Sequence, residues 1–308
     1  MHRDYFFLTP IPPYRLDLTV WTLRRRPDNM VDRWDAATYR RVLSLADGPV
    51  ELAVTQLGSA TAPKLRVAVC SSHLSAARKA IITSILNRLL GLQVDLAPFY
   101  RFAANHPILH DLVREFRGMK PPRFTGAFEG VVNAIACQQL TLTAGIRFLN
   151  RLAGNYGAAI HIGDAIGHAF PQPGSLAAAA PANLRELGFS NNKSRAIIEL
   201  AQSITNGHLD MDQFEVMPDA QAIAHLQNLR GVGRWTAEYV LLRGLGRVHI
   251  FPGDDVGARN NLQRWLHITE PLDYQGVQRA LGSWGRFGGL IYFHLLLRSL
   301  AEAGHIEA

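Results

Sequence analysis

Cysteine is scarce in this chain, which has only Cys70 and Cys137 among its 308 residues. Two thiols cannot build a disulfide framework or supply the four thiolates of a structural zinc or iron–sulfur site. Three common catalytic motifs are also absent from the sequence: the Gly-x-Ser-x-Gly elbow, the phosphate-binding Walker loop and His-Glu-x-x-His. These absences argue against serine hydrolases, nucleoside triphosphatases and zinc peptidases.

Long apolar runs are missing as well. The longest one near the C-terminus, LIYFHLLL, is far shorter than the roughly 20 residues needed to span a bilayer. The first residues, MHRDYFFLTPIPPYRLD, carry charges and prolines where a secretory signal has an uninterrupted apolar stretch. We therefore expect no targeting segment, no membrane partner and a cytoplasmic location, in line with the low cysteine content.

Basic residues outnumber acidic ones by 32 to 25, which gives a formal net charge of +7 and a pI near 9.7. Such an excess favours a polyanionic partner, and without membrane signals this means nucleic acid. The chain is longer than the size at which one hydrophobic core usually stops growing. Two or three packed units are therefore expected.

Between residues 14 and 69, apolar and polar side chains alternate with a period of two, which predicts strands with one buried face. Turn residues between these segments favour antiparallel pairing. The predicted strands include residues 16–20, 50–54 and 65–69. This part of the sequence is therefore expected to form a small antiparallel sheet.

Residues 75–92 change to helical spacing and end near Gly91. The predicted apolar stripe of this helix is Ala77, Ile81, Ile85 and Leu89. From residue 98 to the end the helical period continues. The sequence thus predicts an α+β fold, with a sheet domain over residues 1–97 and a mostly α-helical domain over residues 98–308.

The stretch AIAHLQNLRGVGRWTAEYVLLRGLG reads as two helices joined by Gly231, Val232 and Gly233, a hairpin at about residues 224–244. The glycines allow a tight turn and leave the first N–H groups of the second helix accessible, so that they can bind a phosphate. Arg230 and Arg234 add positive charge on either side. This layout is typical of a helix-hairpin-helix that binds the DNA backbone. A simple turn between packed helices is the alternative, whereas a dinucleotide fingerprint is excluded by the missing third glycine.

Downstream, Trp235, Tyr239 and Leu242 lie on one face of the second helix, a short loop before Phe-Pro-Gly-Asp254-Asp255. Aromatic stripes usually belong to a core, and aspartate before a helix is usually an N-cap. Together, however, an aromatic wall beside a carboxylate would suit a planar, electron-poor guest. Both interpretations stay open on these residues alone.

Two further segments have open interpretations. Lys193 follows a Ser-Asn-Asn loop at the start of a predicted helix, where it is either an exposed side chain or a DNA contact. Gln138 and Gln139 interrupt an apolar helix, so they either face a ligand at the helix end or form a buried hydrogen-bond network. His106 and His110 are spaced four residues apart, but the proline after His106 disfavours a metal site.

These motifs occur together in an order that resembles the helix-hairpin-helix DNA glycosylases, in particular the DNA-3-methyladenine glycosylase II branch. The resemblance covers nearly the whole chain, and the hairpin followed by aspartate is its most specific element. It rests on PPYRLDLTVWTLRRRPDN, FEGVVNAIACQQLTLTAG, LGFSNNKSRAI, LRGVGRWTAEYVLLRGLG and FPGDDVG. It implies two helical subdomains with the active-site cleft between them.

The resemblance assigns the catalytic carboxylate to Asp255 and leaves helix capping to Asp254. Relatives that also cut the DNA strand carry a lysine at the position of Trp235, which implies that this enzyme is monofunctional and leaves an abasic site. The wedge that fills the gap left by the flipped base maps to Gln139, with Leu140 beside it. Alkylated purines of the 3-methyladenine and 7-methylguanine type are the implied substrates.

The implied base pocket consists of Trp235, Tyr239, Phe287 and Trp21. Where relatives often have Trp-x-Pro-Trp-Arg-Ser, this chain has Trp-Gly-Arg-Phe-Gly-Gly at residues 284–289, which suggests a roomier or more flexible rim. The implied DNA contacts are the residues of the hairpin turn, its two arginines and Lys193. The partner is damaged double-stranded DNA bound by a monomer.

No redox or metal cofactor is expected, although relatives hold Na⁺ or K⁺ between the hairpin and a DNA phosphate. Two other functions are left open: excision of an oxidised or deaminated purine, and a non-catalytic protein that binds DNA structure. An aspartate beside an aromatic stripe weighs against the non-catalytic DNA-binding protein. A nucleotide-binding α/β enzyme is excluded because strands and helices do not alternate.

Overall fold

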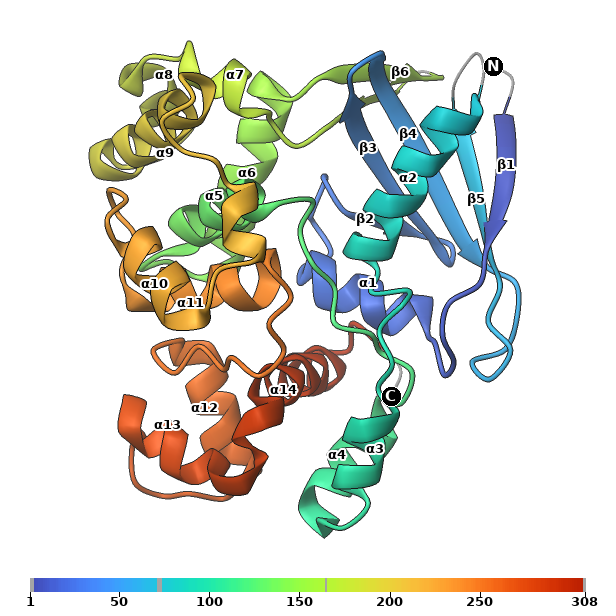
Figure 1. Ribbon diagram of the computed structural model, residues 1–308, viewed down its shortest axis with the longest axis vertical. Coiled ribbons are helices and arrows are strands. Elements are labelled where there is room, and N and C mark those ends of the chain that lie inside the picture. Colours follow the sequence, from blue (N-terminus) through green and yellow to red (C-terminus); the bar gives the residue numbers. More distant parts are fainter. Residues whose placement is uncertain (1–2, 71–73, 164, 307–308) are drawn as a thin grey trace.

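The computed structural model describes residues 3–70, 74–163 and 165–306. An antiparallel five-stranded sheet near the N-terminus is followed by a mostly helical remainder, which confirms the predicted α+β class (Figure 1). The strand order in the sheet is β1-β5-β4-β3-β2. The strands are β1 Arg3–Leu8, β2 Arg33–Asp35, β3 Thr38–Leu45, β4 Gly48–Gln56 and β5 Leu65–Cys70.

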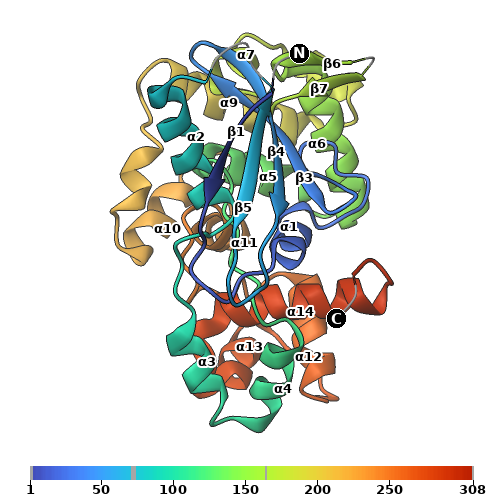
Figure 2. The same cartoon turned by 90° about the vertical axis from the view of Figure 1, so that its right-hand side faces the viewer.

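Helix α2 (Ala76–Leu89) lies across one face of this sheet (Figure 2). Its buried residues are Ile82, Leu86 and Leu89, whereas Ile81 is 51% exposed. Of the predicted stripe, Leu89 is buried and Ile85 is partly buried, whereas Ala77 and Ile81 are exposed, so the first half of the stripe was wrong. Because apolar residues come in adjacent pairs here, two neighbouring stripes fit the spacing equally well, and only contact with the sheet chooses between them.

The predicted strand at residues 16–20 is instead the start of helix α1 (Leu16–Arg24). Nearly every residue of α1 is buried, so the polar positions do not mark an exposed face. Thr19 and Thr22 each donate a hydroxyl to the carbonyl four residues earlier, at 2.9 and 2.8 Å. These bonds satisfy the buried hydroxyls inside the helix, which is why period-two alternation was misleading.

The other helices form two units (Figures 1 and 2). One is built from α5 to α11 and the other from α3, α4 and α12 to α14, each around its own hydrophobic core. Short 3₁₀ turns at Asp212–Glu215 and Gly282–Phe287 and a π-helical turn at Val240–Gly244 complete them. The helices are α3 Ala97–Ala103, α4 Pro107–Glu115, α5 Ala127–Cys137, α6 Leu142–Tyr156, α7 Pro173–Ala177, α8 Pro181–Glu186, α9 Asn191–Thr205, α10 Asp219–Gln227, α11 Arg234–Tyr239, α12 Val256–Trp265, α13 Tyr274–Leu281 and α14 Gly288–Glu302. Within the described ranges, no helix is long and apolar enough to cross a membrane.

A second, two-stranded sheet interrupts the helical part, where only helices were predicted. It pairs β6 (Ala159–Ile162) with β7 (Ala165–His168) beside the larger sheet. A Cβ added to Gly167 would lie 2.9 Å from Cγ2 of Val42 in β3, so the two sheets approach closely there. Strands of four residues are too short for an alternation pattern to reveal them.

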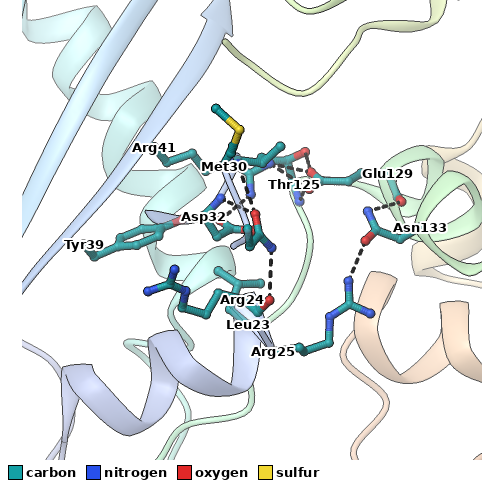
Figure 3. Close-up of polar contacts among 12 residues, drawn as sticks. Leu23, Arg24, Arg25, Met30, Asp32, Tyr39, Arg41, Thr125, Glu129 and Asn133 are labelled. Carbon is teal, nitrogen blue, oxygen red and sulfur yellow. Dashed lines mark hydrogen bonds and ion pairs between the residues drawn. The ribbon is translucent and has the colours of Figure 1, made fainter. Parts of the chain in front are cut away.

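Arg41 of β3 joins the large sheet to the helices (Figure 3). Its guanidinium is 1% exposed and donates to Asp32 at 2.7 Å and to Glu129 of α5 at 2.7 and 2.8 Å. The Tyr39 hydroxyl donates to Asp32 at 2.7 Å, and Thr125 donates its amide and hydroxyl to Glu129. The two carboxylates thus share one cation, and each buried charge is ion-paired and hydrogen-bonded, which is the condition for tolerating it away from water.

Replacing Arg41 with methionine is expected to lower the free energy of unfolding by about 3–5 kcal/mol, because Asp32 and Glu129 lose their buried cation. Urea unfolding followed by circular dichroism measures the change. The control is Arg264→Met, which removes an ion pair with Glu302 whose side chains are 62% and 46% exposed. For Arg264→Met we expect the free energy of unfolding to fall by less than about 1 kcal/mol. Equal losses in the two variants would contradict this role of Arg41.

Candidate active site

A cavity of about 1250 Å³ is lined by residues from both helical units and from the end of α1. Elements distant in the sequence therefore meet there: the link between α5 and α6, the start of α9, the hairpin, the start of α12 and the middle of α14. Its walls include Arg25, Gln138, Lys193, Trp235, Tyr239, Asp255 and Tyr292. A concave site with a few convergent polar groups is the usual form of a binding site for a small guest.

Asp255 has two roles at once in this cavity. As the N-cap of α12, it accepts the Ala258 amide N–H at its Oδ1 at 2.9 Å. Its Oδ2 accepts the indole N–H of Trp235 at 3.2 Å and the hydroxyl of Tyr292 at 3.3 Å. Such donors fix the orientation of the carboxylate.

Asp254 does not cap the helix, contrary to the expectation. Its Oδ2 accepts Nε of Arg234 at 2.7 Å, and the Arg234 guanidinium lies 3.9 Å from the ring centre of Tyr274. Glu238 supports the same loop, because its carboxylate accepts the Tyr274 hydroxyl at 2.6 Å and the Gly253 amide at 3.2 Å. Burial raises the pKa of Glu238. Both aspartates line the cavity, but Asp254 is ion-paired with Arg234 and Asp255 caps α12.

The predicted hairpin is formed by α10 and α11. Gly231, at φ +75°, has the left-handed conformation that glycine adopts at no steric cost, and both Gly231 and Gly233 are exposed while Val232 is buried. Arg230 is not a free cation, because its Nε donates to Glu199 at 2.6 Å. Arg234 is likewise paired. The hairpin thus presents backbone N–H groups rather than unpaired arginines.

Trp235 and Tyr239 pack at 5.5 Å between ring centres, and both line the cavity. Tyr239 is only 2% exposed, and its hydroxyl accepts an N–H of Arg25 at 2.7 Å. Leu242, the third member of the stripe, is fully buried in a core. The stripe is therefore mostly core, with Trp235 as the more accessible aromatic wall.

The two glutamines differ. Gln138 follows the last residue of α5 and donates to the carbonyl of Gly231 at 2.7 Å and the hydroxyl of Thr236 at 2.8 Å, so it lies at a helix end and also belongs to a hydrogen-bond network. Gln139 is exposed at φ +54°, a strained conformation for a side-chain-bearing residue. Leu140 beside it is 44% exposed, and both border the cavity.

Lys193 lies at the cavity edge, but its ammonium is already bonded. Nζ donates to the carbonyl of Ala136 at 3.2 Å and to that of Gln138 at 2.7 Å, at the C-terminus of α5. This is the favourable end of a helix for a cation. The desolvation of Lys193 lowers its pKa.

Two predicted pocket residues lie elsewhere. Phe287 packs on Phe99 and Phe102, with ring centres 5.1 and 5.0 Å apart, and Trp21 stacks on His305 at 5.6 Å. Neither lines the cavity, because both belong to the core that joins α1 to α3, α4 and α14.

The glycines that follow Phe287 do not loosen the rim. A Cβ added to Gly289 would lie 2.8 Å from the carbonyl oxygens of Val248 and Ile250. Gly289 thus allows α14 to pack tightly against the segment before Asp254. The expectation of a roomier rim was wrong.

Sequence reasoning missed Tyr292 and Arg25. Tyr292 lies within the apolar run LIYFHLLL, where a hydroxyl that needs a partner was the available signal. Burial raises its pKa well above the usual value, and the charge of Asp255 adds to this, so its hydroxyl keeps its proton. Arg25 lies in a run of three arginines, and nothing in that run indicates that Arg25 and Arg26 line the cavity whereas Arg24 does not.

Comparisons with known proteins point to one family. A family model described as HhH-GPD superfamily base excision DNA repair protein matches residues 132–286, which include the hairpin and Asp255. A DNA-3-methyladenine glycosylase of Bacillus subtilis is 29% identical over 214 residues, 70% of this chain and 71% of the relative. A putative DNA-3-methyladenine glycosylase of the same bacterium is 27% identical over 84% of this chain and 86% of its own length.

Among solved structures, the 3-methyladenine DNA-glycosylase from Archaeoglobus fulgidus is similar over 95% of this chain and 97% of that one, with a TM-score of 0.82. The sequences are 24% identical, so this likeness shows the fold. It covers the sheet as well as the helices.

The double role of Asp255 predicts a stability difference between two substitutions. Asp255→Ala is expected to lower the free energy of unfolding by about 1 kcal/mol, because the helix loses its cap, whereas Asp255→Asn keeps an oxygen for the Ala258 N–H and should cost a few tenths. Thermal or urea unfolding measures both. Asp254→Ala is the matched control, and its loss in the free energy of unfolding should be as small as that of Asp255→Asn. A larger loss in Asp254→Ala would show that the cap was misassigned.

Proposed function

The chain belongs to the HhH-GPD superfamily of base excision DNA repair proteins, and we propose that it is a DNA glycosylase that releases alkylated purines from duplex DNA and leaves an abasic site. The names of its relatives support the alkylated substrate class. The observation that carries the catalytic assignment is Asp255, a carboxylate held by Trp235 and Tyr292 in the wall of the cavity.

A base inside a duplex cannot reach Asp255, so it must first be flipped out, at a cost of a few kcal/mol that is smallest for damaged bases. Exposed Gln139 and Leu140 border the cavity and would fill the gap in the duplex. The indole of Trp235 offers a face on which the flipped base stacks. For a positively charged alkylated purine, a cation over an aromatic face gains about 0.5–2 kcal/mol.

In the chemical step, the bond between C1′ of the sugar and the base nitrogen breaks, and both electrons leave with the base. The sugar becomes positively charged as this bond lengthens. A carboxylate about 4 Å away, at an effective dielectric constant near 20, would stabilise that charge by roughly 4 kcal/mol, or about a thousandfold in rate. Water then adds to C1′, and Asp255 is placed to orient it and accept its proton.

The hairpin holds the DNA in this proposal. The amides of the exposed residues Gly231 and Gly233 bind a backbone phosphate without reading the sequence, whereas the amide of buried Val232 donates to the Leu229 carbonyl. Since Arg230 and Arg234 are paired, the amides contribute more of the local attraction than expected from the sequence.

A monovalent cation at the hairpin would need oxygen ligands. Backbone carbonyls are the donors that such ions take, and the Gly231 carbonyl, which accepts Gln138, has a second lone pair. The hairpin is therefore compatible with Na⁺ or K⁺ that bridges to a phosphate. Among the described residues, no cluster of three His, Cys, Asp or Glu could hold a metal ion.

The decisive experiment incubates the protein with methylated duplex DNA and identifies the released bases by chromatography. Asp255→Asn is expected to lose about a thousandfold in the rate of base release, while it still binds abasic-site DNA. Asp254→Asn, the matched control, should keep most of the activity because Asp254 faces Arg234. Full activity in Asp255→Asn, or DNA binding without base release by the wild type, would refute the proposal.

We also propose that the enzyme lacks strand-cleaving activity. A Schiff base needs a free amine at the cavity, and Trp235 has none, while the ammonium of Lys193 is bonded to two carbonyls. After base release the DNA strand should stay intact until heat or alkali is applied. Borohydride should trap no covalent complex. A trapped complex that disappears in Lys193→Gln would identify Lys193 as a nucleophile and overturn this expectation.

A further inference from the structure

Arg25 brings a buried positive charge from the N-terminal part of the chain into the wall of the cavity. It directly follows α1 and is 4% exposed. At φ +62° it has a left-handed backbone conformation, which is uncommon for a residue with a side chain. Arg25 is the C-cap of α1 and donates its backbone N–H to the Trp21 carbonyl at 2.9 Å, so the turn that ends the helix sets the position of this side chain.

The hydrogen bonds of Arg25 use only part of its guanidinium. One terminal nitrogen donates to Oδ1 of Asn133 at 2.8 Å (Figure 3). The other donates to the Tyr239 hydroxyl at 2.7 Å. Its Nε is buried without a partner. A guanidinium has five N–H groups. Further donors of Arg25 are therefore not engaged by the residues that the structure describes.

Among the described residues, Arg25 has no counter-ion, in contrast to buried Arg41; buried Arg243 has none either, but it bonds to the carbonyls of Thr22 and Leu23 and does not line the cavity. Arg41 forms ion pairs with two carboxylates, whereas no ion pair of Arg25 is found within residues 3–70, 74–163 and 165–306. A buried charge that only neutral groups solvate is costly to the fold. Arg25 lines the cavity and has N–H groups without acceptors, although burying its charge is costly. This indicates that a molecule bound in the cavity accepts hydrogen bonds from these N–H groups.

The chemistry of Arg25 selects among planar guests. An arginine side chain donates hydrogen bonds and never accepts them. It therefore favours a carbonyl oxygen, which accepts, and disfavours an amino group, because two donors would then face each other. Purines differ in this respect: guanine-type bases have a carbonyl at C6, and adenine-type bases have an amino group there. The aromatic side chains of Trp235 and Tyr239 stack with either base, so they do not make this distinction.

We propose that Arg25 is a specificity-determining residue that donates to the carbonyl oxygen of the flipped base. The cavity therefore favours oxopurines, such as 7-methylguanine, over aminopurines, such as 3-methyladenine. This inference rests on the proposed glycosylase function. Asp255 acts on the sugar in either case, so Arg25 affects which base is released and not how the bond breaks.

Methylated duplex DNA tests the inference, because it contains both bases and one reaction reports their release side by side. In Arg25→Met, kcat/KM for 7-methylguanine should fall about ten- to a hundredfold more than kcat/KM for 3-methyladenine, the effect of one charge-assisted hydrogen bond. A loss of folded protein lowers both values equally, so it leaves their ratio unchanged. Arg25→Lys keeps a charge and a donor and should retain part of the preference.

Arg24→Met is the matched control. Arg24 is the preceding residue, is equally buried at 4% exposure, bonds only to backbone carbonyls and does not line the cavity. Its ratio of released bases should equal that of the wild type. An equal fall for both bases in Arg25→Met, or the same change of ratio in Arg24→Met, would overturn the inference while the glycosylase function stands. A wild-type protein that releases neither base would instead refute the proposed function.

Discussion

The buried guanidinium of Arg41 is the interaction on which the joint between sheet and helices depends (Figure 3). It lies between Asp32, in the loop that follows α1, and Glu129, in the first turn of α5. Three charged groups with so little exposure are stable only as a set, because removing one leaves the others without compensation. The sheet domain is thereby held in one orientation on the helical part.

That orientation matters for the cavity, because the network continues toward it along α5. Asn133, one turn after Glu129, donates to the Glu129 carbonyl and accepts from Arg25, which in turn donates to Tyr239. Tyr239 packs on Trp235, whose indole N–H reaches Asp255. The N-terminal domain is therefore part of the site and not an appendage.

Asp255 shows how a residue can serve structure and chemistry together. One carboxylate oxygen caps α12, and this bond fixes the direction in which the other oxygen points, toward Trp235, Tyr292 and the cavity. The adjacent Asp254 neutralises Arg234, so the two aspartates have different surroundings although they are neighbours in sequence. Capping and catalysis, treated as alternatives at the level of sequence, are compatible in three dimensions.

Local patterns in the sequence were enough for the features that depend on near neighbours. Turn glycines, caps and apolar spacing predicted the sheet-then-helix order and the hairpin, and the order of motifs indicated the family. The α1 helix was missed because its buried threonines bond within the helix, and the β6–β7 pair because its strands are short. Tertiary structure alone decided that Arg25 and Tyr292 line the cavity, that Phe287 and Trp21 do not, and that the hairpin arginines are paired. Each of these outcomes depends on residues that are distant in the sequence. The spacing of neighbouring residues does not show which distant group a side chain will contact.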